Sequence, residues 1–158
     1  GALALALARA RPEARVTAVE REEAALALAA ENVAAHGFGE RVALVRSDWF
    51  SGLAADEAFD LIVANPPYLA DAELAGVEPE VRDHEPRSAL TSGQEGTEDL
   101  ARILRGARTR LRPEAWLWCE TGPEQRARLE ELARAAGFTR VEAHRDLAGR
   151  ERFLAVAG

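Results

Sequence analysis

The sequence predicts an α/β fold: a doubly wound, mostly parallel sheet with an antiparallel hairpin at its carboxyl-terminal edge. Short apolar, valine-containing runs alternate with longer runs of helical period along the chain. This alternation is typical of parallel strands that are joined by crossover helices. The last two strand-like runs have no helix between them, which favours an antiparallel pair. With 158 residues, the chain is long enough for a buried core, and we expect a single domain over residues 1–158.

The first half of the chain contains two helical runs and two strand-like runs. Residues 2–10 are rich in Ala and Leu and predict a helix. Residues 15–20 and 41–46 are short, contain valines and predict strands. Between them, residues 22–36 predict a helix with an acidic first turn and a stop at Gly37. The expected buried stripe of this helix is Leu26, Ala29, Ala30 and Val33.

The middle of the chain combines a strongly apolar run with a long irregular stretch. Residues 59–64 are almost wholly apolar, as in a strand that is covered on both faces. Residues 69–96 have no clear period and predict a long loop, which is often functional in a compact domain. Thr97 is expected to cap the next helix. The apolar stripe of that helix is Leu100, Ile103, Leu104, Ala107 and Leu111.

The carboxyl-terminal part predicts three more strands and one helix. Residues 115–119 predict a strand, and the following helix is expected to open at Pro123 and to close at Gly137. Residues 140–144 and 152–156 predict the strands of the closing hairpin.

Composition narrows the classes of function. An apolar content of 47% with 30% charged residues indicates a soluble globular protein, with no membrane span and no signal peptide visible. The one cysteine, Cys119, is expected in the core and cannot form an internal disulfide, which favours the cytoplasm. A net charge of −7 makes a nucleic acid an unlikely main partner. No spacing of potential ligands predicts a metal site.

The most informative motif is Asn65-Pro66-Pro67-Tyr68, directly after the apolar strand. The prolines fix the backbone angle φ and have no N–H group, so their main chain offers only acceptors. Asn65 adds a side-chain carbonyl, and Tyr68 adds an aromatic face. Such a site suits a flat group that carries an NH₂, either an amide or an amino-substituted base. The plainer alternative is an ordinary strand stop.

Other candidate residues lie where neighbouring strands end. Glu20 ends a strand about twenty residues after Gly1, a spacing at which acidic residues bind ribose hydroxyls in nucleotide-binding folds. Gly1 precedes a helix, and Asp48 and Trp49 follow the second strand, where they could face an adenine. The alternatives are a chain end for Gly1, a solvated strand end for Glu20, and a turn cap and a core residue for Asp48 and Trp49.

Taken together, these motifs resemble the Rossmann-like class I S-adenosylmethionine-dependent methyltransferases, and more narrowly the HemK/PrmC family. That family methylates the side-chain amide nitrogen of glutamine in peptide chain release factors. The tetrapeptide alone is shared with adenine-N6 and guanine-N2 methyltransferases. The resemblance is carried by Gly1–Ala6, Val19-Glu20, Ser47-Asp48-Trp49-Phe50, residues 59–68, Glu85-Pro86 with Ala89-Leu90, and Gly137-Phe138.

The resemblance implies a role for each matching residue. Gly1 would be the last glycine of the loop beside the methionine part of S-adenosylmethionine. Glu20 would hold its ribose, and Asp48 and Trp49 its adenine. Asn65 would contact both cofactor and substrate. Asn65, Pro66, Pro67 and Tyr68 would form the glutamine site, with Asn65, Pro66 and Tyr68 acting in catalysis.

The resemblance also implies parts that this sequence does not contain. The family's first, central strand and its small N-terminal helical domain would precede Gly1. We therefore expect the 158-residue chain to transfer methyl groups weakly or not at all.

Two other functions stay open. One is methylation of an amino group in DNA or RNA, which would require a basic rim and a pocket for a flipped base. The other is a non-catalytic remnant that only binds a partner. The net charge and an acidic stretch oppose the first. The acidic stretch consists of Asp71, Glu73, Glu78, Glu80, Asp83 and Glu85.

Overall fold

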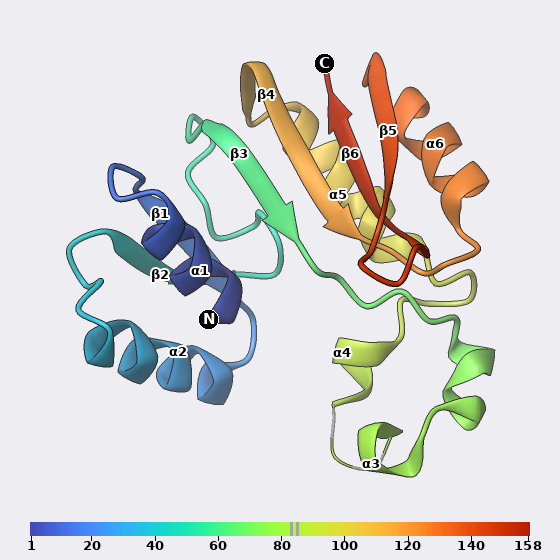
Figure 1. The fold of residues 1–158 in the computed structure, drawn as a ribbon, viewed down its shortest axis with the longest axis horizontal. Helices are drawn as coiled ribbons and strands as arrows, with labels where there is room; N and C mark the ends of the chain where they lie inside the picture. The colour runs from blue at the N-terminus through green and yellow to red at the C-terminus, as the bar shows by residue number, and fades with distance from the viewer. Residues whose placement is uncertain (83, 85) are drawn as a thin grey trace. The chain divides into compact units, whose positions relative to one another are not determined.

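A computed structural model describes residues 1–82, 84 and 86–158 of the chain. The chain divides into two compact units, residues 1–57 and residues 58–158. Helices and strands are present in both units, which confirms the predicted α/β class (Figure 1). That they act as one catalytic domain stays a prediction.

The first unit packs two helices against a two-stranded parallel sheet. Strand β1 (Val16–Glu20) pairs with β2 (Val42–Arg46). Helices α1 (Ala2–Ala10) and α2 (Glu23–Ala35) contact both strands, and all four elements are close to their predicted bounds. The predicted buried stripe of α2 was too wide, since Ala30 is exposed. The reason is that two short strands cover only a narrow face of this helix. The buried core residues are Ala4, Ala8, Val33 and Val42.

Helix α2 ends where the sequence predicted, at a glycine. Gly37 has a φ of 70°, in the left-handed region that favours glycine. The N–H groups of Gly37 and Phe38 donate to the carbonyl oxygens of Ala34 and Val33, over 3.0 Å each. These are the two hydrogen bonds of a Schellman motif, which satisfies the last carbonyls of a helix.

The second unit is built on a four-stranded sheet in the order β3-β4-β6-β5. Strand β3 (Phe59–Ala64) runs parallel to β4 (Leu111–Glu120). Strand β6 (Glu151–Ala157) is antiparallel to β4 on one side and to β5 (Arg140–Arg145) on the other. This confirms the antiparallel hairpin predicted at the carboxyl-terminal edge.

Helices α5 (Glu98–Arg108) and α6 (Arg126–Ala135) contact this sheet and each other. Two predicted boundaries were wrong. Leu111, which was predicted to lie on the helix, begins β4, because α5 ends at the turn around Thr109. Helix α6 begins three residues after Pro123, which was predicted to open it. The residues that α5 buries are Leu100, Ile103, Leu104 and Ala107.

Thr97 occupies the N-cap position of α5, but its side chain makes no capping hydrogen bond. The carboxylate of Glu98 instead accepts the N–H groups of Thr97 and Glu95, over 3.0 and 3.1 Å. In the first turn of α5, the N–H of Asp99 donates to the Ser92 hydroxyl over 2.7 Å. The predicted cap residue is therefore in place, but Ser92 supplies the capping acceptor.

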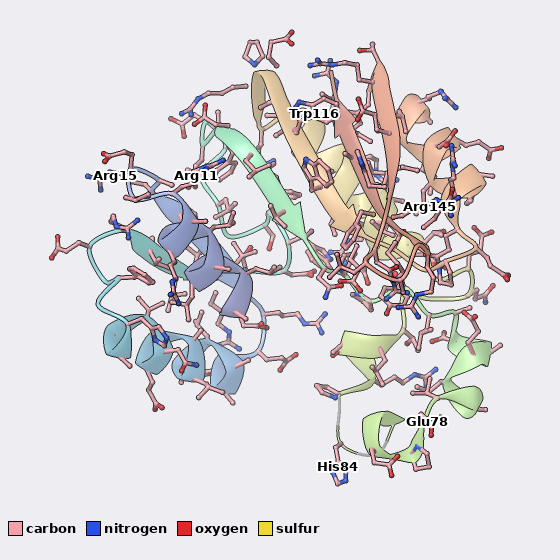
Figure 2. The ribbon with its side chains drawn as sticks, viewed as in Figure 1. Arg11, Arg15, Glu78, His84, Trp116 and Arg145 are labelled. Carbon is pink, nitrogen blue, oxygen red and sulfur yellow. The ribbon has the colours of Figure 1, made fainter. Side chains whose placement is uncertain are left out.

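One face of the sheet is less covered than the sequence predicted. Leu61 and Val63 of β3 are 45% and 37% exposed, so this strand is not covered on both faces. In β4, Leu117 and the predicted core residue Cys119 are buried. The alternate residue Trp116 is half-buried, because α5 contacts β4 from the other face (Figure 2).

In the predicted loop over residues 69–96, the residues that the structure describes form three short helical segments. They are the 3₁₀ helix η1 (Asp71–Gly76), α3 (Pro79–Arg82) and α4 (Arg87–Leu90). Segments this short have no apolar period that a sequence pattern could reveal. Expectations for Asp83 and Glu85 lie outside the described residues.

Candidate functional site

Asn65-Pro66-Pro67-Tyr68 leaves the carboxyl end of β3, as the sequence predicted. Asn65 is exposed, Tyr68 is half-buried, and both proline side chains are buried. The two proline rings thus anchor the segment, while the side chains at its two ends remain accessible.

A groove of about 380 Å³ opens at this segment. The motif supplies the polar groups of its lining, and the other lining side chains are apolar. A concave apolar surface with a few polar groups is the usual form of a binding site. The lining residues are Asn65, Pro66, Pro67, Tyr68, Leu69, Val77, Ala89 and Leu90.

The main chain that follows the motif is bonded to the end of α4 and to the residues after it. Leu69 N–H donates to the carbonyl oxygen of Leu90 over 3.2 Å, and Ser92 N–H donates to that of Leu69 over 2.9 Å. Leu69 and Thr91 form a parallel β-bridge. These bonds fix the floor of the groove to its apolar wall.

Gln125 and Gly96 hold the motif from another side. Gln125 Nε2 donates to the carbonyl oxygens of Tyr68 and Gly96, over 2.7 and 3.1 Å. Its Oε1 accepts the N–H of Gly122 over 3.0 Å. Gly96 has a φ of 71°, and a Cβ built there would lie only 2.6 Å from the Tyr68 carbonyl oxygen. The close contact at this point therefore requires glycine.

The ring of Tyr68 is held by side chains from the sheet. Arg152 Nη2 lies 2.9 Å from the Tyr68 hydroxyl oxygen and 2.9 Å from Glu120 Oε1. The hydrogen bond to Tyr68 is the largest contribution to the raised pKa of the Arg152 guanidinium.

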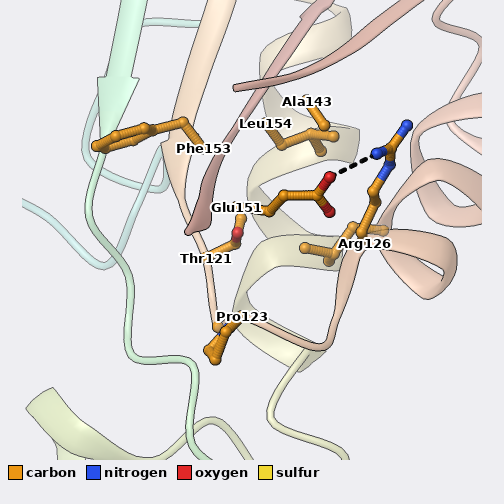
Figure 3. A pocket seen from close by; sticks show the side chains of 9 residues that line it. Thr121, Pro123, Arg126, Ala143, Glu151, Phe153 and Leu154 are labelled. Atoms are coloured by element: carbon orange, nitrogen blue, oxygen red, sulfur yellow. Dashed lines mark hydrogen bonds and ion pairs between the residues drawn. The ribbon is translucent and has the colours of Figure 1, made fainter. Parts of the chain in front are cut away.

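A second hollow lies beside Arg126 and Glu151, whose side chains form an ion pair of 2.8 Å (Figure 3). Its volume is about 10 Å³. This space suffices for about one water molecule and for no larger ligand.

Glu20 lies at the carboxyl end of β1 in the first unit and is half-buried. Its Oε1 accepts the N–H of Glu22, the N-cap residue of α2, over 2.9 Å. This bond holds the Glu20 carboxylate at the start of α2. A carboxylate has about four acceptor sites. Glu20 can therefore also accept the two hydroxyl groups of a ribose.

Asp48 and Trp49 follow β2 in a turn that Ser47 organises. The buried Ser47 hydroxyl donates to the carbonyl oxygen of Trp49 over 2.7 Å and accepts the N–H of Gly52 over 2.8 Å. Trp49 has a φ of 52°, which is uncommon for a large side chain. The half-buried indole and carboxylate give the end of β2 a flat wall and an acceptor.

Gly1 precedes α1 as expected, and its carbonyl oxygen accepts the N–H of Leu5 over 3.1 Å. A Cβ at this position would lie 3.1 Å from the Cβ of Ala29, so the backbone comes close to α2.

The first unit thus offers two carboxylates and a flat indole at its strand ends, from Glu20, Asp48 and Trp49. Such acceptors and such a flat wall suit the ribose and adenine of a nucleoside.

The structure places all predicted site residues at strand ends or helix starts, in two groups. Gly1, Glu20, Asp48 and Trp49 belong to the first unit, and residues 65–68 belong to the second. Sequence reasoning missed Gly96, Glu120, Gln125 and Arg152. Glu120 and Gln125 carried a signal, because they lie at or after the carboxyl end of β4, where a parallel sheet gathers its functional groups.

Comparisons with known proteins identify the family and the fold of the chain. A family model described as "Methyltransferase small domain" matches residues 1–79. The chain is 44% identical over 154 residues to a release factor glutamine methyltransferase of Cereibacter sphaeroides. It is 45% identical over 154 residues to the protein of that name in Bordetella pertussis. These matches cover 98% and 96% of this chain, and the chain spans 55% of the length of each relative.

Among solved structures, the chain resembles a methyltransferase from Pyrococcus furiosus, with a TM-score of 0.69 and 19% identity. The match covers 98% of this chain and 68% of the other. At this identity the likeness supports the fold, which is that of class I methyltransferases. Among the described residues, no helix is long and apolar enough to cross a membrane.

Proposed function

Because the chain belongs to the methyltransferase small domain family, we propose that it is the catalytic part of a protein-glutamine methyltransferase. The acceptor is the side-chain amide nitrogen of a glutamine in a peptide chain release factor. The similarity to enzymes named for this reaction supports the proposal.

The methyl donor in this proposal is S-adenosylmethionine, which supplies a methyl group activated by its sulfonium. The first unit provides residues that suit its nucleoside. Glu20 accepts the ribose hydroxyls, and the half-buried Trp49 presents a flat surface to the adenine. Asp48 accepts from the adenine amino group. Gly1, whose backbone lies close to Ala29 of α2, would lie beside the methionine part of the donor.

The second unit provides the groups that suit a carboxamide. The nitrogen of an amide is a poor nucleophile, because its lone pair is delocalised into the carbonyl. Asn65 Oδ1 and the Pro66 carbonyl oxygen each accept one of its two N–H bonds. Two fixed acceptors orient the nitrogen and favour a less planar geometry, which is catalysis by positioning and electrostatic preorganisation.

The remaining residues of the motif bind without exchanging protons. The ring of Tyr68 packs against the flat amide, and its electron-rich face attracts positive charge. Pro67 keeps the main chain rigid. The apolar wall of the groove, which includes Val77 and Leu90, accommodates the chain that flanks the glutamine.

One observation carries the proposal: Asn65-Pro66-Pro67-Tyr68 lines an accessible groove of about 380 Å³. The test compares acceptors for the complete product of the gene that encodes this chain. With radiolabelled S-adenosylmethionine, we expect label on an unmethylated release factor and none on DNA or ribosomal RNA. Label on a nucleic acid would support the amino-group alternative. No transfer to any acceptor would favour a binding role.

The cellular location is part of the same proposal. Cys119 is a buried free thiol in the second unit, and it is the only cysteine of the sequence. A chain without internal disulfides is suited to the reducing cytoplasm.

A further inference from the structure

Arg152 of β6 reaches the side chain of Tyr68, which is 84 residues away in the sequence. Its Nη2 donates to the Tyr68 hydroxyl oxygen over 2.9 Å, and its Cζ lies 4.9 Å from the centre of the ring. One guanidinium therefore restrains the hydroxyl and the ring together. Because arginine has no acceptor, the Tyr68 oxygen must be the acceptor in this bond.

Glu120, at the carboxyl end of β4, holds the guanidinium in place. Its Oε1 lies 2.9 Å from the same Nη2, and the two side chains are only 20% and 29% exposed. Since both groups are half-buried, solvent screens this pair less than a surface pair. Glu120 also balances the positive charge of Arg152 next to the groove.

We propose that Arg152, held by Glu120, is a positioning residue that fixes the ring of Tyr68 for the substrate amide. This inference rests on the proposed function, in which Tyr68 packs on the amide. A small displacement of a group that orients a reacting atom can cost a large factor in rate. Arg152 itself touches neither substrate nor donor in this account.

The single tyrosine of the sequence allows a direct test of the ring's position. Incorporation of 3-fluorotyrosine gives a ¹⁹F resonance for Tyr68, which Tyr68→Phe assigns by removing it. We expect Arg152→Gln to move this resonance toward the value of the unfolded chain and to sharpen it. An unchanged resonance would overturn the proposal, whatever the enzyme methylates.

Arg140 offers a matched control on the same sheet. Its Cζ lies 4.9 Å from the centre of the Trp116 ring, and its Nη2 lies 3.0 Å from Glu114 Oε2. Arg140→Gln therefore removes a similar ring contact and ion pair without touching Tyr68. It should leave the ¹⁹F resonance unchanged. Equal shifts in both variants would mean that Arg152 only supports the sheet.

Kinetics of the complete gene product separate positioning from folding. For release factor methylation, we expect Arg152→Gln to lower kcat by about 10-fold while KM stays within about twofold. Arg152→Lys should recover only part of kcat, because an ammonium group cannot cover the ring and bind Glu120 in the same planar way. Full activity of Arg152→Gln would overturn the proposal. A shifted resonance with no methylation by the unsubstituted enzyme would instead refute the proposed function alone.

Discussion

The side-chain amide of Gln125 donates to the main-chain carbonyl oxygen of Tyr68 over 2.7 Å, across 57 residues of sequence. The same nitrogen donates to Gly96, so one side chain joins three segments of the second unit. These bonds bind the end of the Asn-Pro-Pro-Tyr motif to the loop that precedes α6. The motif is therefore stiff at both ends: its prolines fix one end, and Gln125 fixes the other.

Gln125→Glu should loosen the motif, because a carboxylate cannot donate to the two carbonyl oxygens. We expect the free energy of unfolding to fall by about 1–3 kcal/mol, since each abandoned acceptor loses its partner. Amide hydrogen exchange at Leu69 and Ser92 should accelerate, and denaturant titration gives the stability. Gln94→Glu at an exposed position is the control. Equal effects of the two substitutions would contradict the assigned role.

Gly96→Ala should be more damaging than alanine at another glycine with positive φ. A Cβ on Gly96 would meet the Tyr68 carbonyl oxygen at 2.6 Å and the Ala70 nitrogen at 2.8 Å. Gly149 has a φ of 80° with nothing within 4 Å of the added atom. Gly149→Ala should lower the free energy of unfolding by about 1 kcal/mol, from backbone strain alone. Gly96→Ala should lower it several times more. Denaturation midpoints that rank the variants the other way would count against the packing described.

The motif and its strand were visible in the sequence because their signal is local. Two prolines after an apolar run stop a strand wherever they occur, and glycines that end helices, such as Gly37, are equally local. The residues that hold the motif were not visible. Gln125 and Arg152 reach Tyr68 over 57 and 84 residues, and only the pairing of β4 with β6 brings Arg152 close. The short helices after the motif were missed because they are too short for a period.

Glu20→Gln should weaken the binding of S-adenosylmethionine. The amide keeps one acceptor oxygen but loses the negative charge and the second acceptor that suit ribose hydroxyls. A loss of about 10-fold in affinity is expected for a charged hydrogen bond. Calorimetric titration of the complete gene product measures it. Glu23→Gln, which affects only an exposed pair with Arg46, should bind as before. Unchanged affinity for Glu20→Gln would remove Glu20 from the nucleoside site.

Stability above about pH 9 should depend on Cys119. Burial raises the pKa of this thiol from 9.0 to about 12. In that range the unfolded chain loses the thiol proton while the folded chain keeps it, so the free energy of unfolding falls as pH rises. The expected slope is about 1.4 kcal/mol per pH unit. Denaturation of the original chain and of Cys119→Ala at about pH 8 and about pH 10.5 isolates this contribution. Identical pH dependence in both chains would show that the thiol is not buried.

In the proposed function, Asn65 and Pro66 present a glutamine side chain for methylation. Its most direct measurement is fragmentation mass spectrometry of a release factor after incubation with S-adenosylmethionine and the complete gene product. We expect one added methyl group, on the side-chain nitrogen of a single glutamine. Asn65→Ala should abolish this methylation, and no other acceptor should be methylated in its place. A methyl group on any other side chain, or undiminished methylation by Asn65→Ala, would contradict the proposed function.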